Sequence, residues 1–348
     1  MSKIAILGHG VVGSGTAEVF LKNKESISVK LGRDADIKYI LDVRDFPDCE
    51  YGDRFTKDFD VILNDPEITV VAELIGGIHP AYDFVKALLL AGKSVVTSNK
   101  ELVAKKGAEL LDIAQQRNVS FLFEASVGGG IPIIRPLQSC LSADSIYEIT
   151  GILNGTTNFI LTKMFRDSMP FEEALSLAQD NGYAERDPSD DVNGVDACRK
   201  ICILASMIFG KRVNPDDVVC EGITSLTQAD IDFCESRGGT CKLIARAVRN
   251  GDRFEVIVCP AFVSGDNQLY GVSDVYNAIM VRGEATGDVV FYGKGAGKFP
   301  TASAVVNDIV NALNKSGGTT LSWSDEVLEL SEASVVEVCG NVRVFEGL

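Results

Sequence analysis

One acidic stretch of the chain, residues 182–200, ends on a lysine: GYAERDPSDDVNGVDACRK. Most charge runs of this kind are solvated loops. From Gly194 onward, however, apolar residues recur mostly at three- and four-residue steps as far as Gly210, which predicts a helix. Asp196 and Lys200 then stand one turn apart on the same side, near the start of that helix. An exposed pair of this kind contributes only a few tenths of a kcal/mol, so the spacing alone leaves both interpretations open.

Histidine is scarce in this chain, which restricts the groups available for proton transfer. His9 and His79 are the two histidines in the sequence. Histidine is the usual acid or base near neutral pH, so proton transfer here falls to one of these two, to a lysine or to a carboxylate. His79 follows a pair of glycines and is predicted to be a loop residue.

The N-terminal segment SKIAILGHGVVGSGTAEVFLKN has the spacing of a dinucleotide-binding turn. A strand over 3–7 precedes Gly8, Gly10 and Gly13, and a helix is expected from about 11 to 21. Glycines at these points allow a tight turn, a close backbone approach to a pyrophosphate and close helix packing. The alternative is a glycine-rich turn without a ligand.

The next strand, within IKYILDVRD, ends at Asp42, Arg44 and Asp45. An acidic residue at this point would bind the ribose hydroxyls of NAD, whereas an arginine accommodates the 2′-phosphate of NADP. The sequence offers both residue types, so it leaves the choice between NAD and NADP open.

Alternation of strands and helices predicts the fold class, which is α/β with a doubly wound, mainly parallel Rossmann-type sheet. Further strands are expected over 61–64, 69–77, 94–100 and 119–130, with helices over 81–92 and 101–117 between them. Ligands bind at the carboxyl ends of such strands, where Gly76, Gly77, Lys100 and Glu124 fall. This dinucleotide-binding domain is predicted to span 1–130, with 297–348 returning to it. A second α+β domain, for substrate binding and dimerisation, is predicted over 131–296.

Composition limits the classes of partner. The formal net charge is −16 and the pI is about 4.6, which argues against nucleic acid and anionic membranes. The longest apolar run, 201–209, is far shorter than the roughly 20 residues of a membrane span. The nine cysteines form no CxxC pair, so reduced thiols are expected rather than disulfides or zinc. We expect a cytoplasmic protein that acts on a small molecule.

Eight segments, in order from residue 4 to about 312, resemble homoserine dehydrogenases: GHGVVG, ELIGG, VVTSNKELVA, FEASVGGGIPII, GILNGTTNFI, GYAERDPSDDVNGVDACRK, GVSDVYNAI and FYGKGAGKFPTASAVV. The resemblance implies NAD(P)-dependent interconversion of L-homoserine and L-aspartate 4-semialdehyde, on the path to threonine and methionine. It also implies a homodimer.

Carried over by motif, the resemblance assigns residue roles. Lys200 becomes the general acid/base and Lys100 a second lysine at the catalytic site and near the cofactor. Substrate binding falls to Glu185, Asp196 and Thr156, although Thr156 could instead belong to a helix cap. The implied cofactor contacts are Gly8, Gly10, Val11, Val12, Gly13, Arg44, Gly76, Lys100, Gly182 and Gly297. A sodium ion is implied at Glu124 and at the backbone oxygens of Val127, Gly129 and Ile131, although these glycines could form only a tight crossover.

Two further interpretations compete with this one. A dinucleotide-sensing protein without catalysis would explain the glycines but not the carboxylate and lysine pattern. A phosphorylating semialdehyde dehydrogenase needs a cysteine nucleophile and a histidine base, and Cys140 is a candidate thiol, but neither histidine lies in the second half. Many relatives carry a C-terminal regulatory ACT domain, for which the tail 317–348 is expected to be too short. That tail could add strands to the edge of a sheet.

Overall fold

The computed structural model describes residues 2–314 and 321–348, which form two compact units. The first unit comprises 1–134 and 296–325, and the second comprises 135–295 and 326–348. Each unit is described by itself below. The start of the predicted tail, up to residue 320, lies outside the described residues. No helix in the described ranges is both long and apolar enough to span a membrane.

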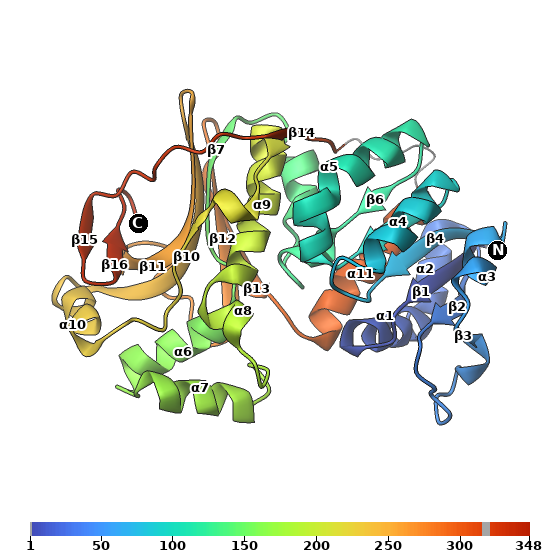
Figure 1. Cartoon of the computed structure of the whole chain (residues 1–348), viewed down its shortest axis with the longest axis horizontal. Coiled ribbons are helices and arrows are strands. Elements are labelled where there is room, and N and C mark those ends of the chain that lie inside the picture. Colours follow the sequence, from blue (N-terminus) through green and yellow to red (C-terminus); the bar gives the residue numbers. More distant parts are fainter. Residues whose placement is uncertain (1, 315–320) are drawn as a thin grey trace. The chain divides into compact units, whose positions relative to one another are not determined.

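The first unit contains a parallel six-stranded sheet, which confirms the predicted fold class (Figure 1). The strand order is β3 (Phe55–Thr56), β2 (Ala35–Leu41), β1 (Ser2–Leu7), β4 (Ile68–Glu73), β5 (Ser94–Thr97) and β6 (Phe121–Leu122). All the strand pairs are parallel. The order changes direction between β1 and β4, and ligands of doubly wound sheets bind at such a reversal.

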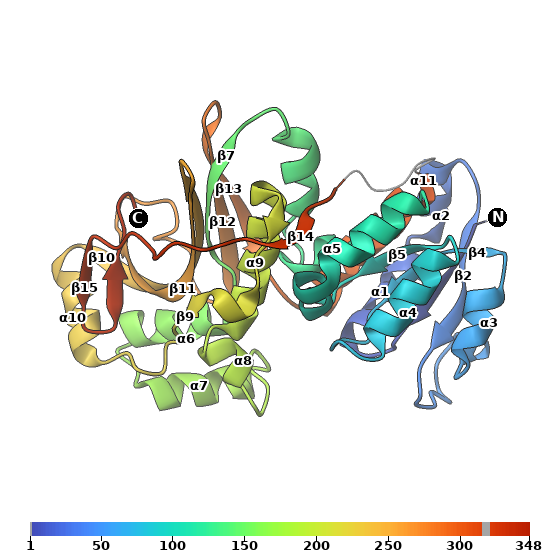
Figure 2. The ribbon, with the colours of Figure 1, turned by 45° about the horizontal axis from the view of Figure 1, so that its top comes forward.

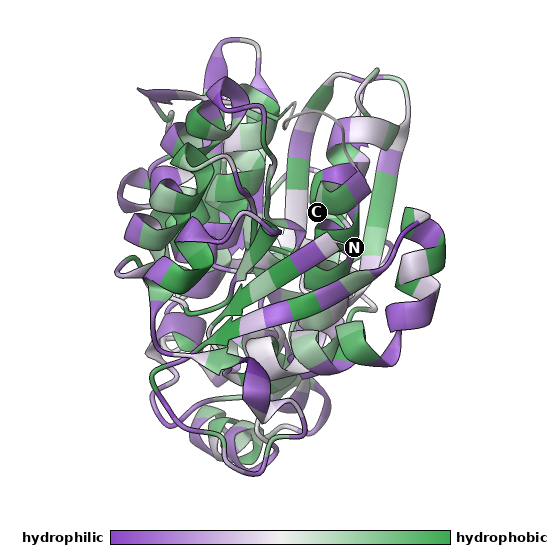
Figure 3. Ribbon diagram, turned by 90° about the vertical axis from the view of Figure 1, so that its right-hand side faces the viewer, coloured by the Kyte–Doolittle hydropathy of each residue, from purple (hydrophilic) through white to green (hydrophobic). Residues whose placement is uncertain are grey.

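Helices cover both faces of this sheet because its strands are apolar on both sides. They are α1 (Val11–Lys22), α2 (Lys24–Leu31), α3 (Phe59–Asn64), α4 (Ala81–Leu90), α5 (Lys100–Gln116) and α11 (Lys298–Asn314). Alternate strand residues such as Ile4, Ile6 and Val70 share a buried cluster with Phe20 of α1 and Ile309 of α11. On the other side of the sheet, α4 and α5 lie next to each other (Figure 2). The helices carry hydrophobic and hydrophilic bands, as one-sided packing requires (Figure 3).

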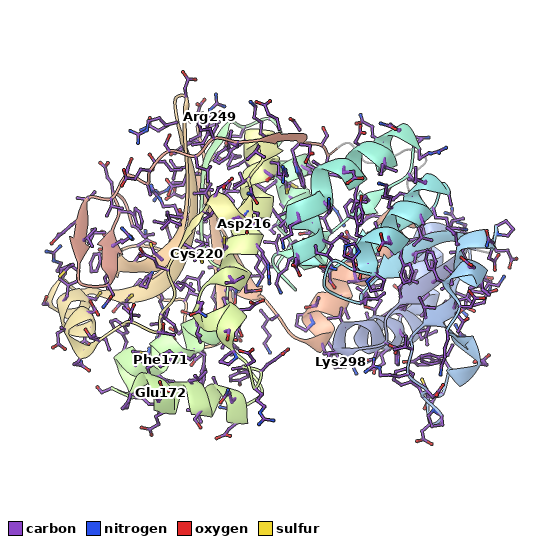
Figure 4. All side chains as sticks on the ribbon, in the orientation of Figure 1. Phe171, Glu172, Asp216, Cys220, Arg249 and Lys298 are labelled. Carbon is purple, nitrogen blue, oxygen red and sulfur yellow. The ribbon has the colours of Figure 1, made fainter. Side chains whose placement is uncertain are left out.

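The second unit is built on a largely antiparallel sheet with the order β13 (Gly287–Lys294), β12 (Tyr276–Gly283), β7 (Ile146–Ile152), β10 (Gly239–Asn250), β11 (Arg253–Ser264), β16 (Val342–Val344) and β15 (Glu337–Cys339). Short β9 (Val219–Cys220) pairs with β11, and β8 (Lys211–Arg212) pairs with β14 (Ser324–Val327). Its helices are α6 (Gly155–Arg166), α7 (Phe171–Asp180), α8 (Ser189–Val192), α9 (Val195–Phe209) and α10 (Gln228–Ser236). Figure 4 labels Phe171 and Glu172 at the beginning of α7.

Three predicted elements differ from the structure. Residues 61–64 belong to helix α3 rather than a strand, because Asp58 caps the helix by accepting a hydrogen bond from the Asp60 amide. The strand predicted over 119–130 is limited to β6, since the backbone turns at Glu124 into a short 3₁₀ helix and then a glycine turn. The tail expected to return to the first unit divides, and 326–348 belong to the second unit because β16 pairs with β11.

Candidate active site

The glycine loop between β1 and α1 has the shape that a bound pyrophosphate needs. Gly8 has φ +93°, and a Cβ there would lie 2.7 Å from the Leu74 carbonyl oxygen. A Cβ on Gly13 would lie 2.0 Å from the Gly8 carbonyl oxygen, so glycine alone lets α1 start this close to β1. At Gly10, by contrast, a Cβ would meet nothing within 4 Å. The space beside the N-terminus of α1 is therefore open to an anion.

Other predicted cofactor residues lie around this loop. Val11 is 68% exposed at the first turn of α1, and Val12 packs against the core beneath it. Gly297, with φ +112°, precedes α11, whose first residue Lys298 forms an ion pair with Glu18 of α1 (Figure 4). Gly76 lies in the exposed turn after β4 with φ +86°. The first unit thus brings together most of the predicted dinucleotide contacts.

At the end of β2, Asp42 is held by a dense set of hydrogen bonds. It accepts from the amides of His9 and Arg44 and from two nitrogens of the Arg44 guanidinium, at 2.7 to 3.0 Å. These bonds, those from the guanidinium first, hold the pKa of Asp42 far below its usual value. His9 is buried edge-on against three aromatic rings, and burial lowers its pKa. Asp42, a candidate for the ribose hydroxyls of NAD, and Arg44, a candidate for the 2′-phosphate of NADP, are therefore bound to each other.

A buried carboxylate that the sequence analysis did not single out organises the loops after β4 and β5. Glu73 is fully buried, accepts from the amides of Ile75 and Gly76, and receives the Thr97 hydroxyl at 2.6 Å. Burial raises the pKa of Glu73, and these hydrogen bonds oppose the rise. The Thr97 hydroxyl oxygen in turn accepts from the Asn99 amide. The feature of the sequence that could have identified Glu73 is its position at the end of a buried parallel strand.

Asn99 continues this network to the predicted catalytic lysine of the first unit. Its side chain donates to the Gly77 carbonyl oxygen and caps α5 by accepting from the Leu102 amide. Lys100, the first residue of α5, is half-buried beside this cap. The backbone position of Lys100 is thus fixed from both neighbouring loops. His79 lies apart from the network, where its exposed ring nitrogen Nδ1 is 2.8 Å from Asp83 Oδ2.

Glu124 forms the centre of the turn that was predicted to bind sodium. Its carboxylate accepts from the amides of Ile133 and Ile134, and its own amide donates to Asp308. The turn 128–131 is tight: the Ile131 amide donates to the Gly128 carbonyl oxygen, and Gly129 has φ +56°. No cluster of three or more histidine, cysteine, aspartate or glutamate side chains suited to a metal occurs among the described residues. Any cation at this turn would therefore depend on backbone oxygens.

In the second unit, helix α9 runs from Val195 to Phe209, between the glycines predicted as its limits. Asp196 and Lys200 are both buried, which excludes the solvated-loop interpretation for this end of the acidic stretch. The Lys200 ammonium donates to Asp196 Oδ2 at 2.7 Å and to the Leu153 carbonyl oxygen at 2.8 Å. Two of its three N–H bonds are used in this way. A buried ion pair must have good geometry to offset the cost of desolvation. The Asp196–Lys200 pair is therefore not an ordinary contact between surface charges.

Asn154, at the N-cap of α6, joins Asp196 to a second carboxylate. Its side-chain amide donates to Asp196 Oδ2 at 2.9 Å and to Asp191 Oδ1 at 2.7 Å, while its oxygen caps α6 by accepting from the Thr157 amide. Burial raises the pKa of Asp191, and the Asp196 charge adds to the rise. The sequence analysis did not assign a site role to Asn154 or Asp191. The feature of the sequence that could have identified Asn154 is the position of an asparagine directly before a predicted helix.

The remaining predicted substrate residues differ in their surroundings. Thr156 is buried in the first turn of α6, and its hydroxyl donates to the Tyr183 carbonyl oxygen at 2.7 Å. Gly182, with φ +71°, precedes Tyr183 in the same loop, so this predicted cofactor residue belongs to the second unit. Glu185 is exposed two residues further on. The structure therefore brings Thr156, Asp196 and Lys200 together around Asn154, and leaves Glu185 at the surface.

The start of α9 is fixed by its packing. Gly194 has φ +82°, and a Cβ there would lie 3.0 Å from Cys220 Sγ, so little space separates this turn from β9. Figure 4 labels Cys220 beside the helices α8 and α9. The arrangement offers carboxylates for an ammonium group and a buried ammonium for an oxygen that gains negative charge. It suits an amino-acid substrate whose oxygen takes or loses a proton.

Comparison with known proteins agrees with this chemistry. Residues 132–310 match the family model for homoserine dehydrogenase, and residues 8–124 match that for its NAD-binding domain. Homoserine dehydrogenase from Synechocystis sp. is 43% identical over 319 residues, which cover 89% of this chain and 72% of the relative. The Bacillus subtilis enzyme is 43% identical over 313 residues, covering 88% and 72%. The chain belongs to the homoserine dehydrogenase family.

Solved structures give the same result. A homoserine dehydrogenase from Thiobacillus denitrificans superposes with a TM-score of 0.86 at 40% identity, covering 90% of this chain and 73% of that one. A putative homoserine dehydrogenase from Archaeoglobus fulgidus has a TM-score of 0.82 at 31% identity, covering 89% and 99%. The enzyme is thus an NAD(P)-dependent oxidoreductase that interconverts L-homoserine and L-aspartate 4-semialdehyde. A phosphorylating dehydrogenase and a protein without catalysis are both excluded.

The hydrogen bonds of Asn154 lead to a prediction about stability. In Asn154→Asp, a third carboxylate replaces the amide that separates Asp191 from Asp196. We expect a loss of about 2 kcal/mol in the free energy of unfolding at pH 8, because buried like charges lose their shared donor. The loss should shrink towards pH 5, since the raised pKa of Asp191 lets it take up a proton first.

Urea unfolding at the two pH values measures this difference. Asn193→Asp is the matched control, because it adds the same charge to the same stretch at an exposed position. An equal loss in both variants, or no dependence on pH, would show that Asn154 does not separate the two carboxylates.

Proposed function

We propose that Lys200 is the general acid/base of homoserine oxidation and aspartate semialdehyde reduction. The observation that carries the proposal is its buried ammonium, which bonds to Asp196 and the Leu153 carbonyl oxygen and keeps one N–H unused among the described residues. That N–H can reach the substrate oxygen without breaking either bond. Asp196 favours the charged form of the lysine, and burial opposes it.

The chemistry at the oxygen follows from charge. A bound nicotinamide supplies or accepts the hydride at the carbinol carbon of the substrate. During aldehyde reduction the carbonyl oxygen gains negative charge, and Lys200 neutralises it and then donates the proton that completes the hydroxyl group. In the opposite direction the neutral amine of Lys200 takes the hydroxyl proton. Asp196 holds the lysine in place throughout.

Substrate recognition in this proposal uses the carboxylates and hydroxyl near Lys200. The ammonium group of homoserine requires a carboxylate, which we assign to Glu185, and Asp196 and Thr156 line the same end of α6 and α9. Glu185 follows Tyr183, whose carbonyl oxygen accepts from Thr156, so its loop is tied to the helix that carries the site. We assign Lys100, at the capped start of α5, as the second lysine near the substrate and nicotinamide.

The first test removes the proton-transfer group. Lys200→Met should lower kcat by about 100-fold or more, the usual contribution of a general acid/base. Because the methionine also leaves Asp196 without its cation, Lys200→Arg is a second variant that keeps the charge. Arginine cannot give up a proton near neutral pH, so it should lose a similar factor.

Steady-state kinetics on folded protein measures both variants, with Lys163→Met, which removes a half-buried lysine outside the proposed site, as control. If Lys200→Arg retains near-normal kcat, the proton passes through another group and Lys100 becomes the candidate.

A second test concerns the acidic loop. Glu185→Gln should raise KM for homoserine by about 10-fold while KM for the cofactor changes little, because a charge-assisted bond to the substrate is lost. Asp187→Asn, two residues away, removes a charge from the same loop and serves as control. Equal increases in both KM values would show that the loop orders the whole site instead of binding the amino acid.

For the cofactor, we propose that Gly8, Gly10, Val11, Val12 and Gly13 bind the pyrophosphate end, with Gly76, Gly182, Gly297 and Lys100 as further contacts. Arg44 would contact a 2′-phosphate of NADP after leaving Asp42, whereas Asp42 would bind the ribose of NAD after losing Arg44. One structural neighbour, a hyperthermophilic archaeal homoserine dehydrogenase mutant at 28% identity, is a complex with NADPH. Comparison of kcat/KM for NAD and NADP decides the preference.

We also propose a sodium ion at Glu124 and the backbone oxygens of Val127, Gly129 and Ile131. Oxygen ligands suit a hard cation, and the buried turn with positive φ at Gly129 gathers them within a few residues. The ion would stabilise this turn. Replacing sodium with choline in the assay should lower activity or thermal stability, and no change in either would leave the glycines as a tight crossover only.

A homodimer is the assembly we propose, through the sheet of the second unit. The support is family membership together with a broad sheet in that unit. Sedimentation velocity at several concentrations measures the state, and a monomer at all of them would contradict the proposal.

A further inference from the structure

One cavity in the second unit has no part in the proposed reaction. It has a volume of about 270 Å³ and lies where the C-terminal end of α6 meets the start of β10. Its polar lining includes Thr162, Arg166, Glu235, Thr240, Lys242 and Ser273. The Asp196 and Lys200 pair lies instead at the N-terminal end of α6, through Asn154.

Lys242 makes this cavity unusual. Its side chain is 97% buried, and its ammonium donates to Asn158 Oδ1 at 3.0 Å and to the Val272 carbonyl oxygen at 2.6 Å. Both acceptors are neutral, and no carboxylate of the described residues lies within 4 Å of the ammonium. A buried cation without a counter-charge is costly. Burial accordingly lowers the pKa of Lys242 to about 8.

The charged groups around Lys242 come from several elements. Arg166 of α6 opposes its charge, whereas Asp274 favours it more weakly than burial opposes it. Arg166 is exposed and donates to the Ser273 hydroxyl at 2.7 Å, so its guanidinium is held at the edge of the cavity. Glu235, near the end of α10, is an exposed carboxylate in the same lining.

We propose that this cavity binds a small α-amino acid, with its carboxylate against Lys242 and Arg166 and its ammonium towards Glu235. The carboxylate supplies the counter-charge that Lys242 lacks and can use the third ammonium N–H. A simple anion would leave Glu235 as a repelling neighbour, whereas a zwitterion satisfies charges of both signs. Thr240 adds a further hydroxyl group to the polar lining, whereas the hydroxyls of Thr162 and Ser273 bond within the protein.

Calorimetric titration of the full chain with three matched probes tests the ligand class. L-Alanine carries both charges, propionate lacks the ammonium, and L-alaninamide lacks the carboxylate. We expect saturable binding of L-alanine, and at least about 10-fold weaker binding of the other two, because each loses a charge-assisted hydrogen bond. Propionate binding as tight as that of L-alanine, or no saturable binding of L-alanine, would overturn the proposal.

Two variants locate the binding. Arg166→Gln alters an exposed side chain and should weaken L-alanine binding about 10-fold, and Lys242→Gln should weaken it at least as much. Lys163→Gln removes a charge from the same helix outside the cavity and should leave binding unchanged. Circular dichroism verifies that each variant folds. If Lys242→Gln does not fold, the affinity of Arg166→Gln alone decides the test. Unchanged affinity in Arg166→Gln would assign the alanine to another site, such as that for homoserine, and overturn the proposal.

Discussion

The buried ion pair between Asp196 and Lys200 is the interaction on which the second unit's site depends. Two charges within one helix turn would contribute little at the surface, but here both side chains are more than 90% buried. Their desolvation must be offset by further hydrogen bonds, and the structure supplies them from Leu153 and Asn154. Because these partners lie where β7 leads into α6, the pair fixes α9 against that connection. The position of the lysine that we propose as acid/base and the local packing therefore rest on the same atoms.

Asn154 shows how one neutral side chain serves two purposes. As the N-cap of α6 it satisfies the Thr157 amide, and with its two amide hydrogens it separates Asp191 from Asp196. A carboxylate could provide the same cap but would add a third negative charge. Asparagine is thus suited to a helix that starts beside two acids. Burial raises the pKa of Asp191, and the Asp196 charge adds to that rise.

The sequence was sufficient for the parts of this protein that follow from local pattern. The period of apolar residues predicted α9 between Gly194 and Gly210, and the glycine spacing predicted the turn from β1 to α1. It failed at 61–64, where a cap on Asp58 overrides an apolar run that resembles a strand. Glu73 and Asp191 were missed because the hydrogen bonds that give them their roles come from residues distant in the chain. The exposure of Glu185 likewise depends on how its loop folds and not on its spacing.

The helix starts at the proposed sites divide into two kinds. Asn99 and Asn154 cap α5 and α6 with their own side chains, so these ends are satisfied within the protein. At α1 the N-cap is Gly10, which has no side chain and faces open space, so the amides of the first turn remain available to an anion. At α9 the N-cap is Gly194, and the acid nearby is Asp196, which is already bound to Lys200. The capped starts of α5 and α6 position side chains, as at Lys100 and Thr156, whereas the uncapped start of α1 offers its backbone. The proposed phosphate recognition at α1 can therefore rest on glycines, whereas the proposed amino-acid recognition depends on the side chains of Asp196 and Lys200.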